Sequence, residues 1–394
     1  MRALISAYAC EPRRGSEPGA GWLWVLAAAV NHDVTVLTRA SRRGAFSPGD
    51  RPEGLTIAFV DVPGPLLRVV QSHERLYYVL WQLVAGTTAR RMHRAAPFDV
   101  VHHVTFANAW LPALVHWARA PFVLGPVGGG PTIPRTLLDE LDWRGRLFEL
   151  ARRTARTANS FNPLVRSGWR RANVIVVQNP ETKARLPHRF HGKIVIRWNA
   201  VVGPDLERIV RDEIGAPTSS HPTAVMAGRL LLWKGGTLAV RALTLTRHRW
   251  RLEIVGSGPA ESRLRALVAD LSLSDRVTFT PWVAREELWR RIQDATVVVA
   301  PSLRDDAPLV VAEAQALGVP VIALDQGGPG AMADTPGSTI TLVPITDTSN
   351  VVGQLASALD DTVGRTRERQ PCSAFGLHPL ESFIDAIYER ARRE

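Results

Sequence analysis

The chain has 394 residues, of which 45% are hydrophobic and 22% are charged, and it carries a formal net charge of +11. At roughly 150 residues per domain this length predicts two domains, and the composition excludes a disordered or low-complexity protein. The two cysteines, Cys10 and Cys372, are too few for a disulfide framework and exclude a cysteine-based zinc site.

Short apolar segments rich in Val and Ile alternate with helix-period segments through the first half of the chain. This alternation is typical of parallel strands covered by helices. The predicted strands are residues 3–9, 34–38, 55–61, 100–104, 122–125 and 174–178. The predicted helices are residues 20–30, 71–94 and 137–158.

The alternation restarts in the second half and predicts a second α/β domain. Its predicted strands are residues 224–227, 252–255, 277–279, 297–300, 319–323 and 339–343, and a last helix is predicted over 378–393. Turn formers cluster between the halves, so we assign residues 1–200 to the first domain, 201–222 to a linker and 223–377 to the second domain. Open sheets bind ligands outside the carboxyl ends of their strands. We therefore expect two doubly wound, Rossmann-like domains that face each other across a cleft.

Basic residues concentrate in the first 200 residues, which hold 27 Lys and Arg against 13 Asp and Glu. Such a charge excess indicates nucleic acid, an anionic membrane surface or a phosphate-bearing substrate as the partner. The predicted helix near residues 72–94 carries leucines followed by three arginines. It either lies on an anionic membrane or packs one face on the sheet.

No apolar run reaches the roughly 20 residues that span a bilayer, and the N-terminus shows no cleavable signal pattern. We therefore expect a cytoplasmic protein, with peripheral contact at the inner face of the membrane as the alternative.

A strand-to-turn segment at residues 225–236 carries two cations. Gly228 and Arg229 follow the predicted strand, and Lys234 precedes two glycines that open a helix. The planar guanidinium of arginine can donate hydrogen bonds to two phosphate oxygens at once. Lysine adds a point charge, and glycine lets a ligand approach the backbone. The segment indicates an anion site. The structural alternative is an ordinary turn with solvated cations.

A second segment, residues 302–314, predicts two carboxylates around a helix start. Asp305 or Asp306 is the expected N-cap, Pro308 lies in the first turn, and Glu313 follows two turns into the helix. We expect Asp305 and Glu313 to point toward one ligand, because carboxylates accept hydrogen bonds from the hydroxyls of ribose and other sugars. The alternative is a capped helix with an incidental glutamate.

His102 and His103 end the predicted fourth strand, at the edge where ligands bind. Side chains alternate across a strand, so one of the two is expected to face a ligand, and the pattern does not say which. No further histidine stands at metal-ligand spacing, so no metal site is expected. The alternative is a structural pair in the core.

In order and spacing, these elements resemble the retaining glycosyltransferases of the GT-B fold, specifically glycosyltransferase family 4, over nearly the whole chain. The motifs that carry the resemblance are the glycine turn 19–21, the Gly-Arg-Leu and Lys-Gly of 228–235, the Val-Gly-Ser-Gly-Pro turn 255–259, and the pair Asp305 and Glu313. The family implies a nucleotide-sugar donor, UDP- or GDP-linked, held mainly by the second domain. It also implies a hydroxyl acceptor held mainly by the first domain, and a last helix, 378–393, that crosses back to that domain.

The resemblance implies a role for each matching residue. Arg229 and Lys234 would hold the donor diphosphate, Glu313 would bond the ribose, and Asp305 would touch the transferred sugar where the family usually has glutamate. His102 or His103 would lie beside the donor sugar, and this pair with Arg229, Lys234 and Asp305 forms the implied catalytic set. The remaining implied donor-binding residues are Gly19, Gly21, Gly228, Gly256, Gly258, Leu309 and Gly328.

The resemblance also implies front-face attack, in which the departing phosphate takes the acceptor's proton. No divalent metal or other cofactor is expected, because Arg229 and Lys234 neutralise the diphosphate. The basic first half fits an anionic or lipid-linked acceptor in the synthesis of a cell-surface polysaccharide, glycolipid or other glycoconjugate. The alternatives are a non-catalytic sugar-nucleotide sensor, an epimerase of the same fold, and a nucleic-acid-binding protein. No nucleic acid is expected as a partner, because the first half carries no known nucleic-acid-binding signature.

Overall fold

The computed structural model describes residues 1–47, 49, 52–64, 72–106, 108–212, 221–363 and 369–394. Internal contacts divide the chain into two units. Unit 1 comprises Met1–Gly130, Thr154–Asn199 and Leu377–Glu394, and unit 2 comprises Pro131–Arg153 and Ala200–Gly376. Of the segment expected to be a linker, residues 213–220 lie outside the described residues.

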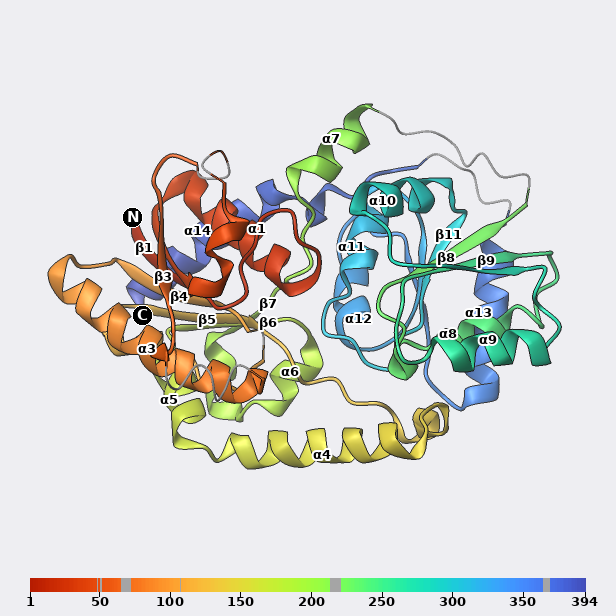
Figure 1. Ribbon diagram of the computed structural model, residues 1–394, viewed down its shortest axis with the longest axis horizontal. Coiled ribbons are helices and arrows are strands. Elements are labelled where there is room, and N and C mark those ends of the chain that lie inside the picture. Colours follow the sequence, from red (N-terminus) through yellow and green to blue (C-terminus); the bar gives the residue numbers. More distant parts are fainter. Residues whose placement is uncertain (48, 50–51, 65–71, 107, 213–220, 364–368) are drawn as a thin grey trace. The chain divides into compact units, whose positions relative to one another are not determined.

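Unit 1 contains a seven-stranded parallel sheet in the order β3-β2-β1-β4-β5-β6-β7. Its strands are β1 (Arg2–Ala7), β2 (Asp33–Arg39), β3 (Leu55–Val60), β4 (Val100–Thr105), β5 (Phe122–Val127), β6 (Val174–Val177) and β7 (Ile194–Ile196). Its helices are α1 (Ser16–Asn31), α3 (Glu74–Ala95), α5 (Pro163–Arg171), α6 (Pro180–Arg185) and α14 (Leu377–Arg393). The short turns η1 (Ala40–Ala45), η3 (Leu114–Ala118) and η5 (His188–Lys193) complete the unit (Figure 1).

Helices cover both faces of this sheet. α1 packs against α14 on one face, where Trp24 and Tyr388 meet the ring of His102. α3 lies on the other face and buries Tyr78 against His103. The prediction that this helix packs one face on the sheet is therefore confirmed.

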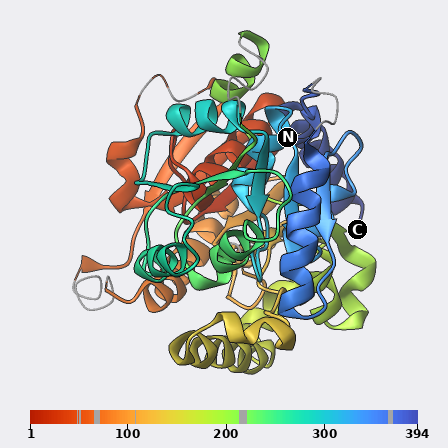
Figure 2. The same cartoon turned by 90° about the vertical axis from the view of Figure 1, so that its right-hand side faces the viewer.

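Unit 2 contains a six-stranded parallel sheet in the order β10-β9-β8-β11-β12-β13. Its strands are β8 (Thr223–Ala227), β9 (Arg251–Val255), β10 (Val277–Thr280), β11 (Val297–Ala300), β12 (Val321–Leu324) and β13 (Ile340–Val343). Its helices are α7 (Pro204–Asp212), α8 (Gly236–Ala242), α9 (Glu261–Asp270), α10 (Arg285–Asp294), α11 (Leu309–Ala316), α12 (Gly327–Ala333) and α13 (Thr348–Thr362). α8 packs against α9 and α13 in this unit, and Figure 2 shows α13 in blue on the side that faces the viewer.

Both sheets confirm the predicted class, an α/β protein with two parallel-sheet, Rossmann-like domains. Each predicted strand is present, with its ends shifted by at most two residues. β7 was not predicted, because three residues are too few to show a periodic pattern. α7 lies inside the segment that we expected to be a linker.

The segment Pro131–Arg153 groups with unit 2, although the sequence analysis assigned it to the first domain. Its turn η4 (Arg135–Glu140) explains the difference, since Leu137 and the flanking Ile133 and Leu141 are buried in the core of unit 2. The carboxylate of Glu140 accepts hydrogen bonds from Thr237 at 2.5 Å and Arg241 at 2.6 Å on α8. These contacts connect residues about a hundred positions apart, which no local pattern reveals.

The helix α4 (Trp143–Ser160) turns its charged side inward. Glu149 is only 2% exposed, and it accepts hydrogen bonds from Arg152 at 2.9 Å and Arg153 at 3.1 Å and pairs with Arg304 at 3.1 Å. The outward side carries Trp143, which is 68% exposed, and further apolar residues. Those further exposed residues are Leu147, Phe148 and Leu150. Around Glu149, α4 therefore buries charge and exposes apolar side chains, the reverse of an ordinary surface helix, although Arg144 and Arg146 are exposed as well and Phe148 stacks on Trp233.

Candidate active site

A small pocket in unit 2 lies at the carboxyl ends of β8 and β11, the two central strands of the sheet. β9 and β12 continue the sheet in opposite directions from these strands, so the pocket sits at the topological switch point where open α/β sheets bind ligands. Gly228, Arg229 and Lys234 line it from the β8 side, and Ser302 and Pro308 line it from the β11 side. The structure thus brings together the two predicted cations and the start of α11.

Lys234 and Asp305 contact each other directly through the ammonium group and the carboxylate. Lys234 ends the turn η6 (Leu232–Lys234), and Asp305 belongs to the loop after β11. Ser302 also donates to the Asp305 carboxylate at 3.3 Å. The predicted phosphate-binding lysine and the predicted sugar-binding carboxylate therefore form one charged pair beside the pocket.

Arg229 is exposed, and no carboxylate of the described residues lies within ion-pair distance of its guanidinium. Its neighbour Gly228 has a φ of +136°, and a Cβ built there would meet no atom within 4 Å. The backbone bend after β8 therefore leaves open space beside the two cations, which is the geometry that an anionic group requires.

Glu313 is buried on α11 and does not line this pocket. Its Oε1 accepts hydrogen bonds from the guanidinium of Arg285 at 2.8 Å and from the indole of Trp289 at 3.0 Å, both on α10. Neither Arg285 nor Trp289 was predicted from the sequence. Their spacing of four residues on one helix was visible, but nothing in the sequence joined them to Glu313.

The loop that carries Asp305 is anchored by a residue that the sequence analysis also missed. Arg304 pairs with buried Glu149 and lies over the ring of Trp233 at 4.7 Å. Burial lowers the pKa of Arg304, with the charge of Arg152 acting in the same direction. Arg304 thus attaches the loop to α4 and to η6, the turn that ends at Lys234.

The predicted N-cap of α11 was wrong. The N-cap is Pro308, and no side chain caps this helix. Asp305 is engaged with Lys234 instead, and the backbone carbonyl of Asp305 accepts from Gly328 at 3.0 Å. Leu309 is the first residue of α11 and is half-buried.

Several predicted donor-binding glycines permit close backbone packing. A Cβ on Gly256 would lie 2.0 Å from the carbonyl of Gly228, and a Cβ on Gly258 would lie 2.3 Å from the carbonyl of Leu230. A Cβ on Gly328 would lie 2.3 Å from the carbonyl of Asp306. Gly256 and Gly258 thus hold the loops after β8 and β9 together, and Gly328 holds the start of α12 against the loop after β11, so these glycines shape the pocket indirectly.

Gly19 and Gly21 lie in unit 1, within the first two turns of α1. A Cβ on Gly19 would lie 1.8 Å from the carbonyl of Arg14, and a Cβ on Gly21 would lie 2.3 Å from that of Ala9. Both glycines let α1 pack tightly against the loop after β1. Their part in donor binding stays a prediction.

His102 and His103 do not end their strand, because β4 continues to Thr105. Both rings are buried, and each ring nitrogen has a partner in unit 1. His102 lies 2.9 Å from the Tyr388 hydroxyl and 2.6 Å from the Gly125 carbonyl. His103 lies 3.1 Å from the Tyr78 hydroxyl and 3.2 Å from the Ser6 hydroxyl. Burial lowers the pKa of His102 to about 4 and that of His103 to about 3. The structure therefore favours the core alternative for this pair.

Neither a metal centre nor a membrane span is evident in the part of the chain that the structure describes. No three His, Cys, Asp or Glu side chains there are grouped so that they could hold a metal ion. No helix there combines the length and the apolarity that crossing a bilayer requires.

Residues 211–373 match the model of the glycosyl transferases group 1 family. A protein of Acidothermus cellulolyticus named D-inositol 3-phosphate glycosyltransferase is 30% identical over 322 residues, which cover 75% of this chain and 67% of that protein. A protein of the same name from Pseudarthrobacter chlorophenolicus is 43% identical over 125 residues, 30% of this chain and 29% of that protein. The chain thus matches two thirds of one relative's length and less than a third of the other's.

Solved structures share the fold over the whole chain. A sucrose-phosphate synthase from Thermosynechococcus elongatus has a TM-score of 0.63 and 20% identity, covering 99% of this chain and 98% of that one. The Anabaena protein HepE, solved in complex with UDP-glucose, has a TM-score of 0.54 and 16% identity, covering 99% of both chains.

Proposed function

This chain belongs to the glycosyl transferases group 1 family and is a glycosyltransferase, and we propose that it moves a sugar from a nucleotide-diphosphate sugar to a hydroxyl acceptor with retention of configuration. The observation that carries this proposal is the pocket at the switch point of unit 2, which Arg229 and Lys234 line together. A diphosphate that lies there would meet two cations and the start of α11.

The chemistry follows from where charge develops. Breaking the bond between the anomeric carbon and the phosphate oxygen leaves a sugar with oxocarbenium character and a diphosphate with added negative charge. Arg229 and Lys234 stabilise that charge more strongly in the transition state than in the ground state, which lowers the barrier. The acceptor oxygen bonds to the anomeric carbon from the face that the phosphate leaves, and the acceptor's proton passes to a phosphate oxygen.

The pair formed by Lys234 and Asp305 gives each residue a role in the donor complex. A bound diphosphate competes for the ammonium of Lys234, so the Asp305 carboxylate becomes able to accept hydrogen bonds from hydroxyls of the sugar. Ser302 keeps that carboxylate at the edge of the pocket during the exchange.

Glu313 serves the nucleoside part of the donor in this proposal. Arg285 and Trp289 both bond to its Oε1 and fix the carboxylate. The second oxygen, Oε2, then accepts from the ribose hydroxyls, as an acidic residue does in dinucleotide-binding folds. Arg285 and Trp289 thereby act as positioning residues.

A UDP-sugar is the first donor to examine, because HepE is a structural neighbour solved with UDP-glucose. GDP-sugars are the second. Two cations at the diphosphate make a divalent metal unnecessary, so turnover is expected to be the same with excess EDTA and with added Mg²⁺.

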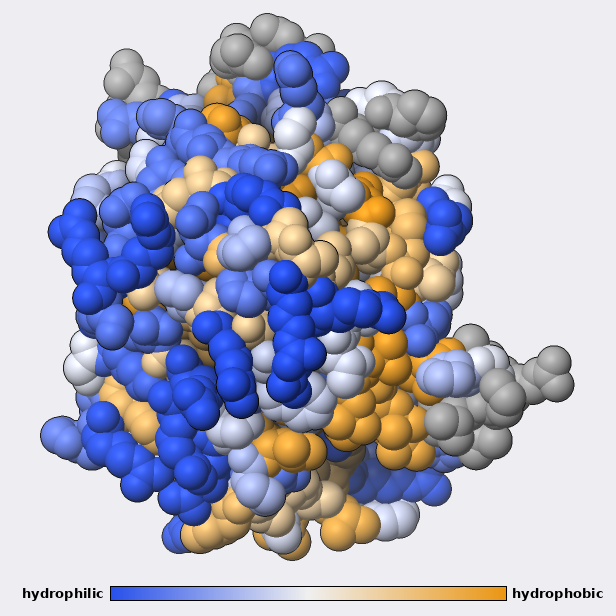
Figure 3. All heavy atoms as spheres, turned by 90° about the vertical axis from the view of Figure 1, so that its left-hand side faces the viewer, coloured by the Kyte–Doolittle hydropathy of each residue, from blue (hydrophilic) through white to orange (hydrophobic). Residues whose placement is uncertain are grey.

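The acceptor is expected to be anionic or lipid-linked, in the synthesis of a cell-surface polysaccharide or glycolipid. The excess of basic residues in the first 200 residues supports this expectation, as does the relatives' name, which contains a phosphorylated polyol. The outer side of α3 offers exposed Leu76 and Leu83 beside exposed Arg90 and Arg91, a combination that suits peripheral contact with an anionic membrane. Figure 3, in which the left-hand side of Figure 1 faces the viewer, shows apolar areas among predominantly hydrophilic side chains.

The stereochemistry of the product tests the proposed reaction. The protein is incubated with UDP-, GDP- and ADP-linked sugars and a panel of hydroxyl acceptors, and the new glycosidic bond is examined by proton NMR. A product with the anomeric configuration of the donor supports the proposal. Inversion would refute the front-face mechanism, and products epimerised without an acceptor would favour the epimerase alternative.

A further inference from the structure

Unit 1 contains a large cavity on the side away from the carboxyl ends of its strands. It has a volume of about 1020 Å³ and is bordered by Pro121 and Phe122 at the start of β5 and by Asn173 just before β6. Helices α3, α5 and α14 and the turn η3 contribute the other walls. Because parallel α/β sheets bind substrates at the opposite edge, the proposed reaction does not use this cavity.

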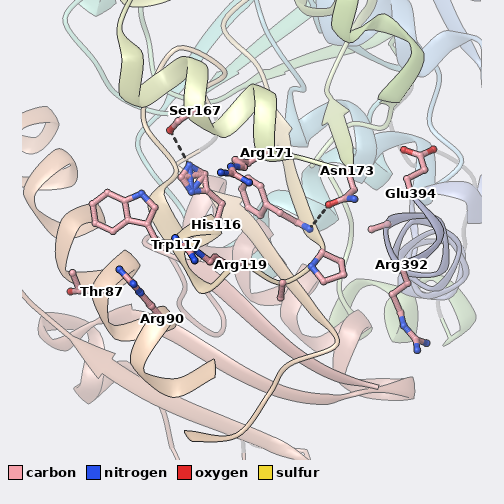
Figure 4. Close-up of a pocket in the computed structure, with 14 residues that line it drawn as sticks. Thr87, Arg90, His116, Trp117, Arg119, Ser167, Arg171, Asn173, Arg392 and Glu394 are labelled. Carbon is pink, nitrogen blue, oxygen red and sulfur yellow. Dashed lines mark hydrogen bonds between the residues drawn. The ribbon is translucent and has the colours of Figure 1, made fainter. Parts of the chain in front are cut away.

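Three arginines from separate parts of unit 1 line this cavity. Arg90 comes from α3, Arg119 follows η3, and Arg171 ends α5 (Figure 4). All three are exposed, and none has a carboxylate of the described residues within ion-pair distance. The half-buried arginines of α4, by contrast, are engaged by a carboxylate or by backbone carbonyls, as Arg152 is. The three cations therefore converge on one space without an internal counter-charge.

The other charged residues that line the cavity, Arg392 and Glu394, do not offset the positive charge of the three arginines. Arg392 approaches Glu389 only to 3.9 Å, and Glu394 is engaged by Arg390 at 2.8 Å. In Figure 4, Arg392 on α14 and Glu394 just after it lie apart from the group formed by Arg90, Arg119 and Arg171. The lining thus holds four arginines against one glutamate.

Polar and aromatic groups at the back of the cavity complete the arrangement. His116 is buried, and its Nε2 lies 2.9 Å from the hydroxyl of Ser167. Its Nδ1 is also buried and has no partner among the described residues. Burial lowers the pKa of His116 to about 4, and the charge of Arg171 acts in the same direction, so the ring is neutral at pH 7. Half-buried Trp117 adds an apolar wall.

The backbone at Arg119 supports a role for its side chain. Arg119 has a φ of +66°, in the left-handed region that favours glycine, and its N–H donates to the carbonyl of His116 at 3.0 Å to end η3. A large charged residue at such a position costs conformational free energy that glycine would avoid. The Arg119 side chain lines the cavity from this position.

We propose that this cavity binds a phosphate ester through Arg90, Arg119 and Arg171, as a site separate from the donor pocket. Three planar guanidinium groups offer paired N–H donors to the phosphate oxygens. Trp117 and Pro121 cover the apolar part of the same molecule. Both a phospholipid head group and a soluble phosphate ester carry this chemistry, and the experiment separates the two sources.

The experiment compares two double variants that remove equal charge from the same helices. Arg90→Gln with Arg171→Gln changes the cavity, whereas Arg75→Gln with Arg170→Gln changes exposed residues of the same helices that do not line it. Binding of sn-glycerol 3-phosphate is measured by calorimetry. Binding to vesicles of phosphatidylcholine, with and without phosphatidic acid, is measured by co-sedimentation. Circular dichroism verifies that both variants fold.

We expect the cavity variant to bind at least about tenfold more weakly than wild type, and the control variant to bind as wild type does. Loss of glycerol phosphate binding would identify a soluble ester. Loss confined to the phosphatidic acid vesicles would identify a lipid head group. Equal weakening in both variants would show a general effect of basic charge and would overturn the proposal, as would the absence of any binding by wild type. Donor binding in unit 2 is measured in the same variants and is expected to be unchanged, so failure here is distinguishable from failure of the proposed reaction.

Discussion

Lys234 and Asp305 are side chains of opposite charge that lie in contact at the edge of one pocket. Their direct contact holds the ammonium at the edge of the pocket before a donor arrives. Arg229 has no such partner among the described residues and faces solvent. Lys234 is therefore the cation whose position the protein controls, and Arg229 is the cation free to follow the diphosphate.

Replacing Lys234 by alanine is expected to lower turnover about a hundredfold to a thousandfold. The reason is the loss of a charge contact worth roughly 3 to 4 kcal/mol in the transition state. Turnover is measured at saturating donor, with Arg263→Ala on the exposed side of α9 as the matched loss of a cation. Turnover of the Lys234 variant within a factor of about two of wild type would remove Lys234 from the catalytic set.

Replacing Glu313 by glutamine is expected to weaken donor binding about tenfold while changing turnover less, since a charged acceptor of the ribose hydroxyls becomes neutral. The amide keeps the shape of the carboxylate, so Arg285 and Trp289 retain an oxygen to bond. Comparing the Michaelis constant for the donor with the turnover number distinguishes this outcome. An unchanged Michaelis constant would mean that Glu313 only supports α10.

At the scale of secondary structure, α4 contradicts the usual relation between polarity and burial. Its arginines hold the loop around residues 131–133, with Arg152 donating to the carbonyl of Pro131 at 2.7 Å and Arg153 donating to that of Ile133. Glu149 neutralises both and also Arg304. The inner side of α4 therefore holds the segment before η4 and the Asp305 loop in place by charged contacts rather than by apolar packing.

The two sides of α4 are expected to respond oppositely to substitution. Glu149→Ala should destabilise unit 2 by about 3 to 5 kcal/mol, because it leaves buried guanidinium groups without a counter-charge. Trp143→Ser on the exposed side should change the unfolding free energy by less than about 0.5 kcal/mol. Urea denaturation of both variants measures the difference. A larger loss for Trp143→Ser than for Glu149→Ala would show that the helix is oriented the other way.

Local patterns predicted most elements but not their long-range contacts. The strands were predictable because buried parallel strands form continuous runs of Val and Ile. The attachment of Ile133 and Leu137 to unit 2 was not predictable, since it depends on contacts with residues about a hundred positions away. Arg229 and Lys234 were found because one turn carries both. Arg285 was not, because its contact with Glu313 joins two helices.

The core position of His102 and His103 also depends on long-range contacts and was not predictable from the sequence. Sequence position suggested an edge of the sheet, yet both rings are buried in the core, where they share hydrogen bonds with Tyr388, Tyr78 and Ser6. A tyrosine nearly three hundred residues away could not be assigned to His102 from the sequence.

At the scale of the whole molecule, buried histidines are concentrated in unit 1. Burial lowers the pKa of His102, His103 and His116 to about 4, 3 and 4. In the unfolded chain these rings take up protons near pH 6.5, whereas in the folded chain they stay neutral. The stability that they contribute is complete above about pH 6.5 and is lost as the pH falls toward the folded pKa values.

Unit 1 is therefore expected to lose up to about 4 kcal/mol of stability per pH unit between about pH 6 and pH 5, since each of three groups contributes about 1.4 kcal/mol. Scanning calorimetry at a series of pH values measures the loss. The transition assigned to unit 1 should move to lower temperature, and His103→Gln should reduce its pH dependence. Midpoints that stay constant between about pH 7 and pH 5 would contradict the burial of these rings.

The proposed transferase reaction depends on the pocket that Arg229 and Lys234 line together. The most direct measurement is the thermal unfolding midpoint of wild type and of a double variant, Arg229→Ala with Lys234→Ala, in the presence of UDP-, GDP- and ADP-linked sugars. A true donor stabilises the folded protein by mass action, by about 2.7 kcal/mol at a hundredfold excess over its dissociation constant. We predict that at least one of these sugars raises the wild-type midpoint and leaves that of the double variant unchanged. Equal stabilisation of both proteins would contradict the account.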